Sequence, residues 1–504
     1  MASNSNYLLV AAIDFGTTYS GYAFSMRHSF EKQPMTIHAN QAWNAGGKQL
    51  LSLKTPTCLL LDSNKQFDSF GYDAEDKYAE IVMDKDQDNY YYFHRFKMCL
   101  HKNKKVSLEM LLEDITGKSM PAIDVFALSI MALKNHLMGS LVTQGTGVES
   151  SDIRWVLTVP AIWTDNAKQF MRESAEKAGI PKDKLLLALE PEAASIYCQY
   201  LPTDKLTGIE PGFTMSEPGT KYMIVDLGGG TADITVHEKL SDGCLRELCR
   251  ATGGDCGGTG VDAEYIQVLI KIVGAPLIEL MKRENPESYL DFIREFETAK
   301  RNRPSDNKKV NMIIPFTTLN TLCRTHLKED FKTAIASSPF SNSIVIRGDK
   351  IRIDVKVFKK MFEKTVENIL QLIRDIIIFK WKSHARSIKF SLLEAVRREF
   401  SNCRVVIPFD PGLSVLKGAV LFGHKSDVIS SRISRFTYGI SFNPKFDPAV
   451  HDKKHRRLSD GVWRCKDAFD KILEKDSVIP IGTTTRRKYT TQTNVSRIWF
   501  RKEL

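Results

Sequence analysis

Residues 221–238 read KYMIVDLGGGTADITVHE, and this stretch decides the expected fold. An apolar run ends in Asp226, a glycine cluster and Thr231 follow, and polar and apolar residues then alternate to His237. Alternation on both sides of a glycine cluster predicts a β-hairpin. Its turn offers N–H groups and a hydroxyl beside Asp226 and Asp233, which suits a phosphate with its Mg²⁺ ion, because amides bind phosphate oxygens and carboxylates hold the metal. An ordinary tight hairpin is the alternative interpretation.

Residues 9–24, LVAAIDFGTTYSGYAF, repeat the same order near the start of the sequence. An apolar run ends in Asp14, the turn is Gly16-Thr17-Thr18, and a second strand-like run follows. We expect each hairpin to place its aspartate at a strand end that faces a shared cleft. The repetition therefore predicts two lobes with a phosphate site between them.

The composition is that of a soluble globular protein. The chain has 504 residues, of which 42% are apolar and 26% are charged, and this length suffices for roughly two to four domains. No uncharged apolar run reaches the roughly 18 residues of a membrane span, so no transmembrane segment is expected. Residues 7–13 lack a basic flank and lead directly into Asp14, which predicts a strand and not a signal peptide.

The cysteines and the charge clusters restrict the environment and the partners. The nine cysteines are scattered and form no Cys-x-x-Cys pair, which argues against a disulfide framework or a zinc site and favours a reducing compartment, the cytoplasm. The net charge of +11 gathers at residues 300–309, 451–457 and 486–488, without interleaved aromatic residues. No nucleic-acid partner is therefore expected. Solvated loops are the preferred interpretation of these clusters, and a weak attraction to anionic surfaces is the alternative.

Two charged residues lie in unusual places. Lys97 lies within the aromatic-rich residues 90–100, YYYFHRFKMCL, where it either snorkels from a strand or reaches a γ-phosphate. Glu190 ends the apolar run of residues 185–189 and precedes Pro191, which is placed as the first residue of a helix. Glu190 either orients a water molecule or caps that helix.

Three further stretches have readable local structure. Residues 153–180 predict a buried strand and a helix that is capped by Thr164 or Asp165. Residues 251–262, ATGGDCGGTGVD, predict a glycine-rich loop over a ligand, with a helix opening at Asp262, although plain turns also carry such glycines. Residues 292–303 predict a charged helix, which by itself is an ordinary solvated face.

These motifs carry a resemblance to a known family. DFGTTYS at residues 14–20, DLGGGT at 226–231 with Asp233, LEPEAA at 189–194 and residues 253–262 resemble the nucleotide-binding motifs of the 70-kilodalton heat-shock protein family, in the same order. The stretches FHRFKMCLHK, LKGAVLFG and RFTYGISF resemble its divergent 12A/12B-like branch. The resemblance spans nearly the whole chain.

The resemblance implies an α/β fold, the two-lobed actin-like ATPase domain. Each lobe would hold a five-stranded mixed sheet flanked by helices. The nucleotide-binding domain would cover residues 1–425, with a first lobe at about 1–218 and a second at about 219–425. Residues 426–504 would form an incomplete substrate-binding β domain, a truncated β-sandwich.

The resemblance also implies which residues bind and hydrolyse Mg-ATP. Lys97 and Glu190 would place the attacking water, Thr231 would touch the γ-phosphate, and Asp226 and Asp233 would support them. Phosphoryl transfer needs mainly positioning and charge neutralisation, which such a set supplies. The implied nucleotide-binding residues are Gly16, Thr17, Thr18, Tyr19, Gly228, Gly229, Gly230, Gly257, Gly258, Glu297, Lys300 and Arg301, and the implied ligands of hydrated Mg²⁺ are Asp14 and Asp226.

The sequence departs from the family pattern in three places. No glycine occurs from Asp349 to Pro411, so the Gly–Gly turn with which the family closes the purine site is missing. We expect that a short connecting segment between Ile388 and Leu392 is missing through a skipped exon or a gene-model error. A genuine loss of this segment is the alternative interpretation. Pro304 stands near the place of an adenine-facing serine and would end the helix early. The C-terminal part is short, with strand-like runs only at residues 429–442, 477–481 and 495–500, which predicts unpaired strand edges.

Three functions agree with this pattern. The first is an ATP-binding, weakly hydrolysing, chaperone-like protein of this branch, with client or partner proteins. The second is a nucleotide-poor scaffold that keeps the fold, which the lost Gly–Gly turn favours. The third is a sugar or acetate kinase of the same superfold, whose acceptor site is not evident. Residues 424–430 lack the acidic and apolar interdomain linker of the family, so coupling between ATP and a client is not assumed.

Overall fold

The computed structural model describes residues 7–40, 43–44, 51–103, 105–207, 215–301, 309–380, 392–400, 403–459 and 461–485. The first lobe is built on a mixed sheet in the order β13-β12-β1-β2-β3, with β6 also paired to β2. Its strands are β1 (Leu9–Phe15), β2 (Tyr19–Met26), β3 (His38–Ala39), β6 (Thr55–Pro56), β12 (Ile153–Val159) and β13 (Leu185–Leu189). Strands β1, β12 and β13 run parallel, and β1 and β2 form the predicted antiparallel hairpin.

Helices cover both faces of this sheet. α4 (Ala122–Thr143) and α14 (Pro411–His424) both pack on β1, and every residue of β1 is buried. The predicted cap of α5 (Asp165–Lys177) is confirmed for Thr164, whose hydroxyl accepts from the Ala167 amide at 3.2 Å. The remaining elements of the lobe are α1 (Arg27–Lys32), β4 (Trp43–Asn44), β5 (Leu51–Ser52), β7 (Cys58–Leu61), β8 (Phe67–Phe70), α2 (Tyr72–Met83), β9 (Tyr91–His94), α3 (Cys99–Lys102), β10 (Leu111–Glu113), β11 (Ser119–Pro121), α6 (Glu190–Tyr200) and β14 (Leu206–Thr207).

Helix α4 is, among the described residues, the one helix long and apolar enough to cross a membrane by length and composition alone. In this structure the apolar residues of one face of the helix, among them Phe126, Ile130 and Leu137, are fully buried in the core of the first lobe. Its apolar character is therefore explained by packing within the lobe.

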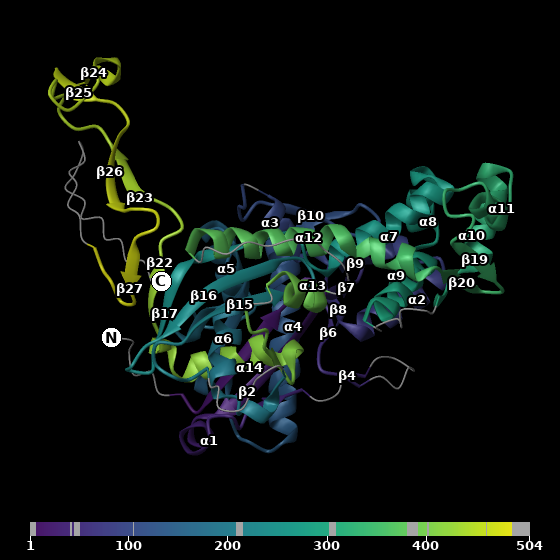
Figure 1. Cartoon of the computed structure of the whole chain (residues 1–504), viewed down its shortest axis with the longest axis horizontal. Helices are drawn as coiled ribbons and strands as arrows, with labels where there is room; N and C mark the ends of the chain where they lie inside the picture. The colour runs from purple at the N-terminus through teal and green to yellow at the C-terminus, as the bar shows by residue number, and fades with distance from the viewer. Residues whose placement is uncertain are drawn as a thin grey trace.

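The second lobe repeats the opening hairpin. Its sheet has the order β15-β16-β17-β22-β27 and consists of β15 (Lys221–Leu227), β16 (Ala232–Lys239), β17 (Leu245–Gly254), β22 (Ile429–Ile433) and β27 (Val478–Pro480). The antiparallel pairing of β15 with β16 confirms the hairpin expected at residues 221–238, and it places Asp226 opposite Asp233. The long helix α12 (Val355–Lys380) lies along this sheet (Figure 1).

The two sheets differ at the position of the first strand. β1 has the parallel neighbour β12, whereas β15 pairs only with β16 among the strands that the structure describes. Residues of β15 are accordingly half-exposed or exposed along its length. The parallel partner lies at the other side of this sheet, where β22 pairs with β17. The junction near Ile388, where a lost segment is expected, lies outside the described residues.

A helical part extends from the second lobe. It contains α7 (Gly258–Val273), α8 (Ala275–Glu284), α9 (Pro286–Arg301), α10 (Phe316–Leu322), α11 (Phe331–Ala336) and the sheet β18 (Val310–Ile313), β20 (Lys350–Ile353), β19 (Ile344–Arg347). Stacked rings of Tyr265, Phe292 and Phe296 form part of its core. The expected helix opening at Asp262 is wrong: α7 begins at Gly258, and Asp262 lies inside it. Pro304 lies outside the described residues.

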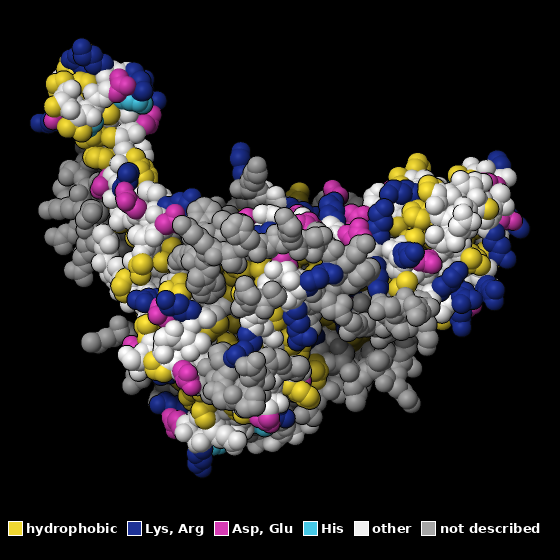
Figure 2. All heavy atoms as spheres, viewed as in Figure 1, with side chains coloured by type: hydrophobic (Ala, Val, Ile, Leu, Met, Phe, Trp, Pro, Cys, Tyr) yellow, Lys and Arg dark blue, Asp and Glu magenta, His cyan; other side chains and the backbone are white. Residues whose placement is uncertain are grey.

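The C-terminal strands leave the body as a narrow arm (Figure 1). β23 (Tyr438–Phe442) pairs with β26 (Ala468–Leu473), and β24 (Arg456–Ser459) pairs with β25 (Val462–Cys465). Each is a two-stranded sheet in the described part of the chain, so the expected unpaired edges are present. Figure 2 shows Lys and Arg side chains at the tip of this arm, around hydrophobic ones. The run at residues 495–500 lies outside the described residues.

The boundary expected at residue 426 falls within a sheet. β22 and β27 both follow this boundary, yet they complete the sheet of the second lobe. Short elements bridge the remaining chain: β21 (Ile407–Pro408), which pairs with β14, and α13 (Leu392–Glu399), which packs against α12.

Candidate functional site

The turns of the two hairpins meet between the lobes. A β-carbon placed on Gly229 would overlap the side chain of Thr18, and one on Gly230 would overlap Thr17 and Met98. Only glycine permits such an approach of backbone to side chain. The predicted phosphate residues therefore come together, and the turns touch one another.

A third glycine-rich segment supports the turn of the second hairpin. The amides of Gly257, Gly258 and Thr259 donate to the carbonyls of residues 230, 228 and 229 at 3.2, 3.1 and 2.7 Å. A β-carbon on Gly257 would lie 2.5 Å from the Gly230 carbonyl carbon. These hydrogen bonds fix one side of the second turn, and its other side faces the first turn.

Several amides of the two turns are available to a ligand. Among the described residues, no acceptor is hydrogen-bonded to the N–H groups of Thr17, Thr18, Gly229 and Gly230. Successive free amides at a tight turn form a concave site for anions. The arrangement fits phosphate oxygens.

The Asp14 carboxylate already has two partners from the protein. Lys54 Nζ lies 2.6 Å from Asp14 Oδ2, and the Thr158 hydroxyl donates to Oδ1 at 2.7 Å. Burial alone would raise the pKa of Asp14, but Lys54 and the more distant Lys97 hold it below its usual value. Asp14 is therefore an ionised carboxylate with a fixed counter-ion.

Asp226 and Asp233 are in a different state, although their hairpin repeats the first. Among the described residues, no donor side chain is hydrogen-bonded to Asp226. Burial raises its pKa well above the usual value, and the charges of Glu190, Asp233 and Asp14 add to the rise. Burial likewise raises the pKa of Asp233, even though the Ile162 amide donates to it at 3.0 Å. The buried Thr231 hydroxyl also favours the Asp233 anion.

Lys97 and Glu190 form a buried ion pair beside these aspartates. Lys97 Nζ lies 2.8 Å from Glu190 Oε1, and it also lies 5.0 Å from the ring centre of Trp163. The side chain of Lys97 is 3% exposed, so it does not snorkel to solvent. Burial raises the pKa of Glu190 to about 7; Lys97 opposes this rise, and Asp14 and Asp233 add to it.

The state of the buried carboxylates indicates whether Mg²⁺ fits the site. A raised pKa shows that a buried carboxylate has too little positive charge around it, and a divalent cation would supply that charge. No group of three or more His, Cys, Asp or Glu side chains among the described residues could coordinate a metal directly. A magnesium ion that keeps most of its waters and binds with a nucleotide fits this donor set, with Asp226 as the carboxylate to which no donor side chain among the described residues is hydrogen-bonded.

The residues expected around adenosine form an ion network across the lobes. Lys300 Nζ lies 2.6 Å from Glu297 Oε2 and 2.7 Å from Asp262 Oδ1. Arg301 Nε lies 2.9 Å from Glu297 Oε1. From the first lobe, Arg95 pairs with Asp262 at 2.7 Å. Burial alone would raise the pKa of Glu297, but Lys300, Arg301 and Arg95 hold it below its usual value.

Tyr19 closes the same side of the cleft. The Arg301 guanidinium lies 4.6 Å from the centre of the Tyr19 ring, and burial raises the pKa of Tyr19 to about 12. Two predicted nucleotide-binding residues from different lobes thus contact each other. Gly16 lies at the base of the first turn, where its carbonyl accepts from the Thr57 hydroxyl at 2.8 Å.

Comparisons with known proteins identify the family. The family described as Hsp70 protein matches residues 77–336. Heat shock 70 kDa protein 12A of Homo sapiens is 34% identical over 552 residues, which cover 97% of this chain and 80% of that protein, and the Mus musculus protein of the same name gives the same values. Heat shock 70 kDa protein 12B of Homo sapiens is 33% identical, with 96% and 78% covered. The chain belongs to the Hsp70 family.

Membership of the Hsp70 family agrees with the architecture. The chain has the actin-like ATPase fold, with mixed sheets flanked by helices. The expected resemblance to the 12A/12B-like branch is confirmed by the identities above. The roles of the individual site residues stay predictions, and the structure adds where each one lies.

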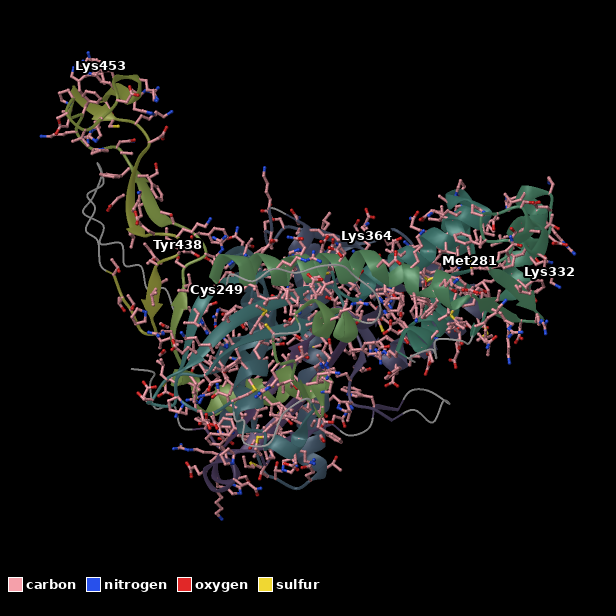
Figure 3. The ribbon with its side chains drawn as sticks, in the orientation of Figure 1. Cys249, Met281, Lys332, Lys364, Tyr438 and Lys453 are labelled. Carbon is pink, nitrogen blue, oxygen red and sulfur yellow. The ribbon has the colours of Figure 1, made fainter. Side chains whose placement is uncertain are left out.

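Strand β22 of this Hsp70-family chain contacts both lobes near the site. β22 pairs with β17 of the second lobe, while Arg432 on β22 forms a double hydrogen bond with Glu192 of α6 at 2.8 and 2.7 Å. Arg435 donates to the carbonyls of Ala161 and Trp163, on either side of the amide that bonds Asp233. Tyr438, labelled in Figure 3 at the base of the arm, donates to Asp165 Oδ2 at 2.8 Å.

Sequence reasoning missed several residues of this site. Lys54 and Thr158 belong to none of the quoted motifs, Arg95 lies in the stretch FHRFKMCLHK but was given no role, and Arg432 lies in the segment assigned to another domain. No sequence signal pointed to Lys54: in the sheet Tyr19 pairs with Pro56, and this register brings residue 54 beside the first hairpin. That register is visible only in the folded chain.

Proposed function

We propose that the chain binds ATP and ADP with the phosphates between the two hairpin turns, and that it hydrolyses ATP slowly as a chaperone-like protein. The observation that carries this proposal is the convergence of two turns with free amides on the buried Lys97–Glu190 pair and three aspartates. Free amides bind phosphate oxygens, and the acids and lysine serve proton transfer and charge neutralisation.

Nucleotide entry requires the lobes to move apart. The two turns are in contact, as the overlap of a Gly229 β-carbon with Thr18 shows. The ion pairs Arg95–Asp262 at 2.7 Å and Arg294–Glu75 at 2.8 Å also join the first lobe to the second. A hinge opening that parts the turns and these pairs would admit the phosphates.

The proposed hydrolysis uses the side chains at the floor of the cleft. Glu190, with a pKa of about 7, can accept a proton from water near neutral pH. Thr231 would donate to the γ-phosphate, and Mg²⁺ bound with the nucleotide would neutralise phosphate charge. Lys97 and Glu190 hold each other at 2.8 Å, so each must partly release the other before it contacts water or phosphate. This requirement supports slow turnover.

The proposed cellular role follows the named relatives. The relatives are named as heat shock proteins, which supports a stress-related chaperone with client proteins, and the scattered cysteines without a Cys-x-x-Cys pair favour the cytoplasm. The C-terminal arm exposes Phe442, Leu458 and Phe469. Exposed apolar side chains of this kind are typical of surfaces that contact other proteins.

A nucleotide-poor scaffold is the second candidate. The observation that favours it is the mutual pairing of Glu297, Lys300 and Arg301, which satisfies these side chains without adenosine. Adenosine would have to replace these bonds with contacts of equal strength. In this case the lobes would stay closed and act through protein contacts alone.

Calorimetric titration of Mg-ATP and Mg-ADP into the whole chain separates the two candidates. We expect dissociation constants of about 1–10 μM and no measurable heat with Asp226→Ala. Asp68→Ala is a matched control, because Asp68 pairs with exposed Lys77 away from the site. A folded wild-type chain that binds neither nucleotide would contradict the proposal and favour the scaffold.

A further inference from the structure

A cavity in the first lobe lies outside the proposed nucleotide site. It is lined by Trp43 of β4, by residues 67–70 of β8, by one side of α2 from Asp73 to Glu80, and by α4 between residues 131 and 136, and we call it the α2–α4 cavity. Its volume is about 410 Å³, at the lower end of the range for small-ligand pockets, roughly 300–1,000 Å³. A cavity of this size can hold one extended side chain.

The acidic side chains of the α2–α4 cavity lack cations. Asp73, Asp76 and Glu80 lie on one side of α2 at spacings of three and four residues, where like charges repel one another. Among the described residues they form no ion pair, while Lys77 of the same cavity lies 2.9 Å from a fourth carboxylate, Asp68. Of the three, Asp73 alone lies in the first turn of α2, where the helix dipole stabilises an acid. On a chain with a net charge of +11, this local negative charge favours a cationic ligand.

Aromatic rings line another side of the cavity. The ring of Trp43 stacks on His136 with 4.2 Å between the ring centres, and the Tyr22 hydroxyl lies 2.8 Å from His136 Nδ1. Burial lowers the pKa of His136, although Asp73 opposes this shift, so the imidazole adds no positive charge near neutral pH. No group of three or more His, Cys, Asp or Glu side chains in the described part of the chain could coordinate a metal. Aromatic rings beside carboxylates instead suit a planar guanidinium group.

Two buried polar atoms of the cavity have no hydrogen-bond partner among the described residues. They are the hydroxyl of Ser69, a residue that is 6% exposed, and the indole N–H of Trp43. A hydroxyl can accept from a guanidinium group, whereas an indole N–H only donates and needs an acceptor such as a peptide carbonyl. A polyamine offers donors alone, and the carboxylate of free arginine would be repelled by the acids of α2. An arginine residue within a peptide chain supplies both the donors and the acceptor.

We propose that the α2–α4 cavity binds an arginine residue of a partner protein. The guanidinium group would lie among Asp73, Asp76 and Glu80, where its forked N–H donors match carboxylate oxygens. A peptide carbonyl next to this arginine would accept from the Trp43 N–H. The cavity shares no residue with the nucleotide site, so this inference does not rest on nucleotide binding or hydrolysis.

Ligand-observed NMR titration of the whole chain with an acetylated and amidated Gly-Arg-Gly peptide tests the proposal. We expect a dissociation constant of about 0.1–1 mM. The same peptide with citrulline, which has the shape of arginine without its charge, should bind at least about tenfold more weakly. Asp76→Asn with Glu80→Gln should weaken arginine binding by a similar factor. The matched control is Asp84→Asn with Glu109→Gln, which removes the same charge from exposed acids outside the cavity and should leave the affinity nearly unchanged.

Three results would overturn the proposal. Equal affinity for the citrulline and arginine peptides would show that the cavity does not recognise the guanidinium charge. Equal losses in the two double variants would reduce the binding to a diffuse electrostatic attraction. Free L-arginine should bind more weakly than the peptide, and equal affinity would assign the cavity to a small molecule and not to a protein. Because Asp76 and Glu80 form no ion pair among the described residues, the melting temperature of their double variant should not fall, so its loss of binding reports on the site itself.

Discussion

Replacing Arg432 with methionine is expected to destabilise the chain strongly. Arg432 donates to both oxygens of Glu192 at 2.8 and 2.7 Å, and the two side chains are 14% and 2% exposed. Removal of one partner from such a buried pair costs about 3–5 kcal/mol, because the other charge stays buried without compensation. Glu247 lies near enough that its own pKa rises partly through Glu192, so the two carboxylates would then repel each other.

Urea unfolding, followed by tryptophan fluorescence, measures this effect as a shift of the transition midpoint. Arg246→Met is the control, because its pair with Glu238 is on the surface and is worth about 0–1 kcal/mol. The double variant Arg432→Met, Glu192→Leu should recover most of the lost stability, since an apolar replacement of a buried pair is often neutral. A midpoint shift for Arg432→Met no larger than that for Arg246→Met would refute the reasoning.

Three further predictions concern single side chains. Burial raises the pKa of Glu247 to about 7, which is above its value in the unfolded chain. The stability that protonated Glu247 contributes is therefore lost as the pH rises from about 4.5 to 7, at about 1.4 kcal/mol per pH unit. Glu247→Gln should flatten the dependence of the free energy of unfolding on pH between about pH 5 and 8, and an unchanged slope would contradict this assignment. Thr231→Val should lower ATP turnover roughly 100-fold with little change in ADP affinity, and equal loss of both would remove its γ-phosphate role. Gly257→Ala would place a β-carbon 2.5 Å from the Gly230 carbonyl carbon, so we expect a loss of about 1–3 kcal/mol of stability together with loss of nucleotide binding. The control Gly139→Ala has open space around the new β-carbon and should stabilise α4 by about 0.5–1 kcal/mol. Equal melting temperatures of the two variants would contradict this expectation.

Local sequence signals were sufficient for the two hairpins. The alternation around residues 226–231 and 14–18 specified strand, turn and strand, and both hairpins are present. The cap at Thr164 was equally readable, and the helix that was expected to begin at Pro191 begins at Glu190. These features depend on backbone conformation and hydrogen bonds within a few residues, so composition and spacing carry the information.

The prediction that a helix starts at Asp262 was wrong for a tertiary reason. The glycines at 257 and 258 were read as loop, but the amides of residues 257–259 are fixed by carbonyls of the Gly228–Gly230 turn. This contact comes from another part of the chain and allows the helix to begin at Gly258. Glycine has low helix propensity, and here tertiary hydrogen bonds override it.

The sequence by itself determined the two hairpins, the placement of their aspartates at strand ends, and the membership of the Hsp70 family. Only the tertiary structure decided that Lys54 is the partner of Asp14, that Asp226 has no such partner among the described residues, and that Arg432 ties β22 to α6. The physical reason is that strand register and burial join residues far apart in sequence. A charge acquires its partner and its pKa from those neighbours, and no local pattern records them.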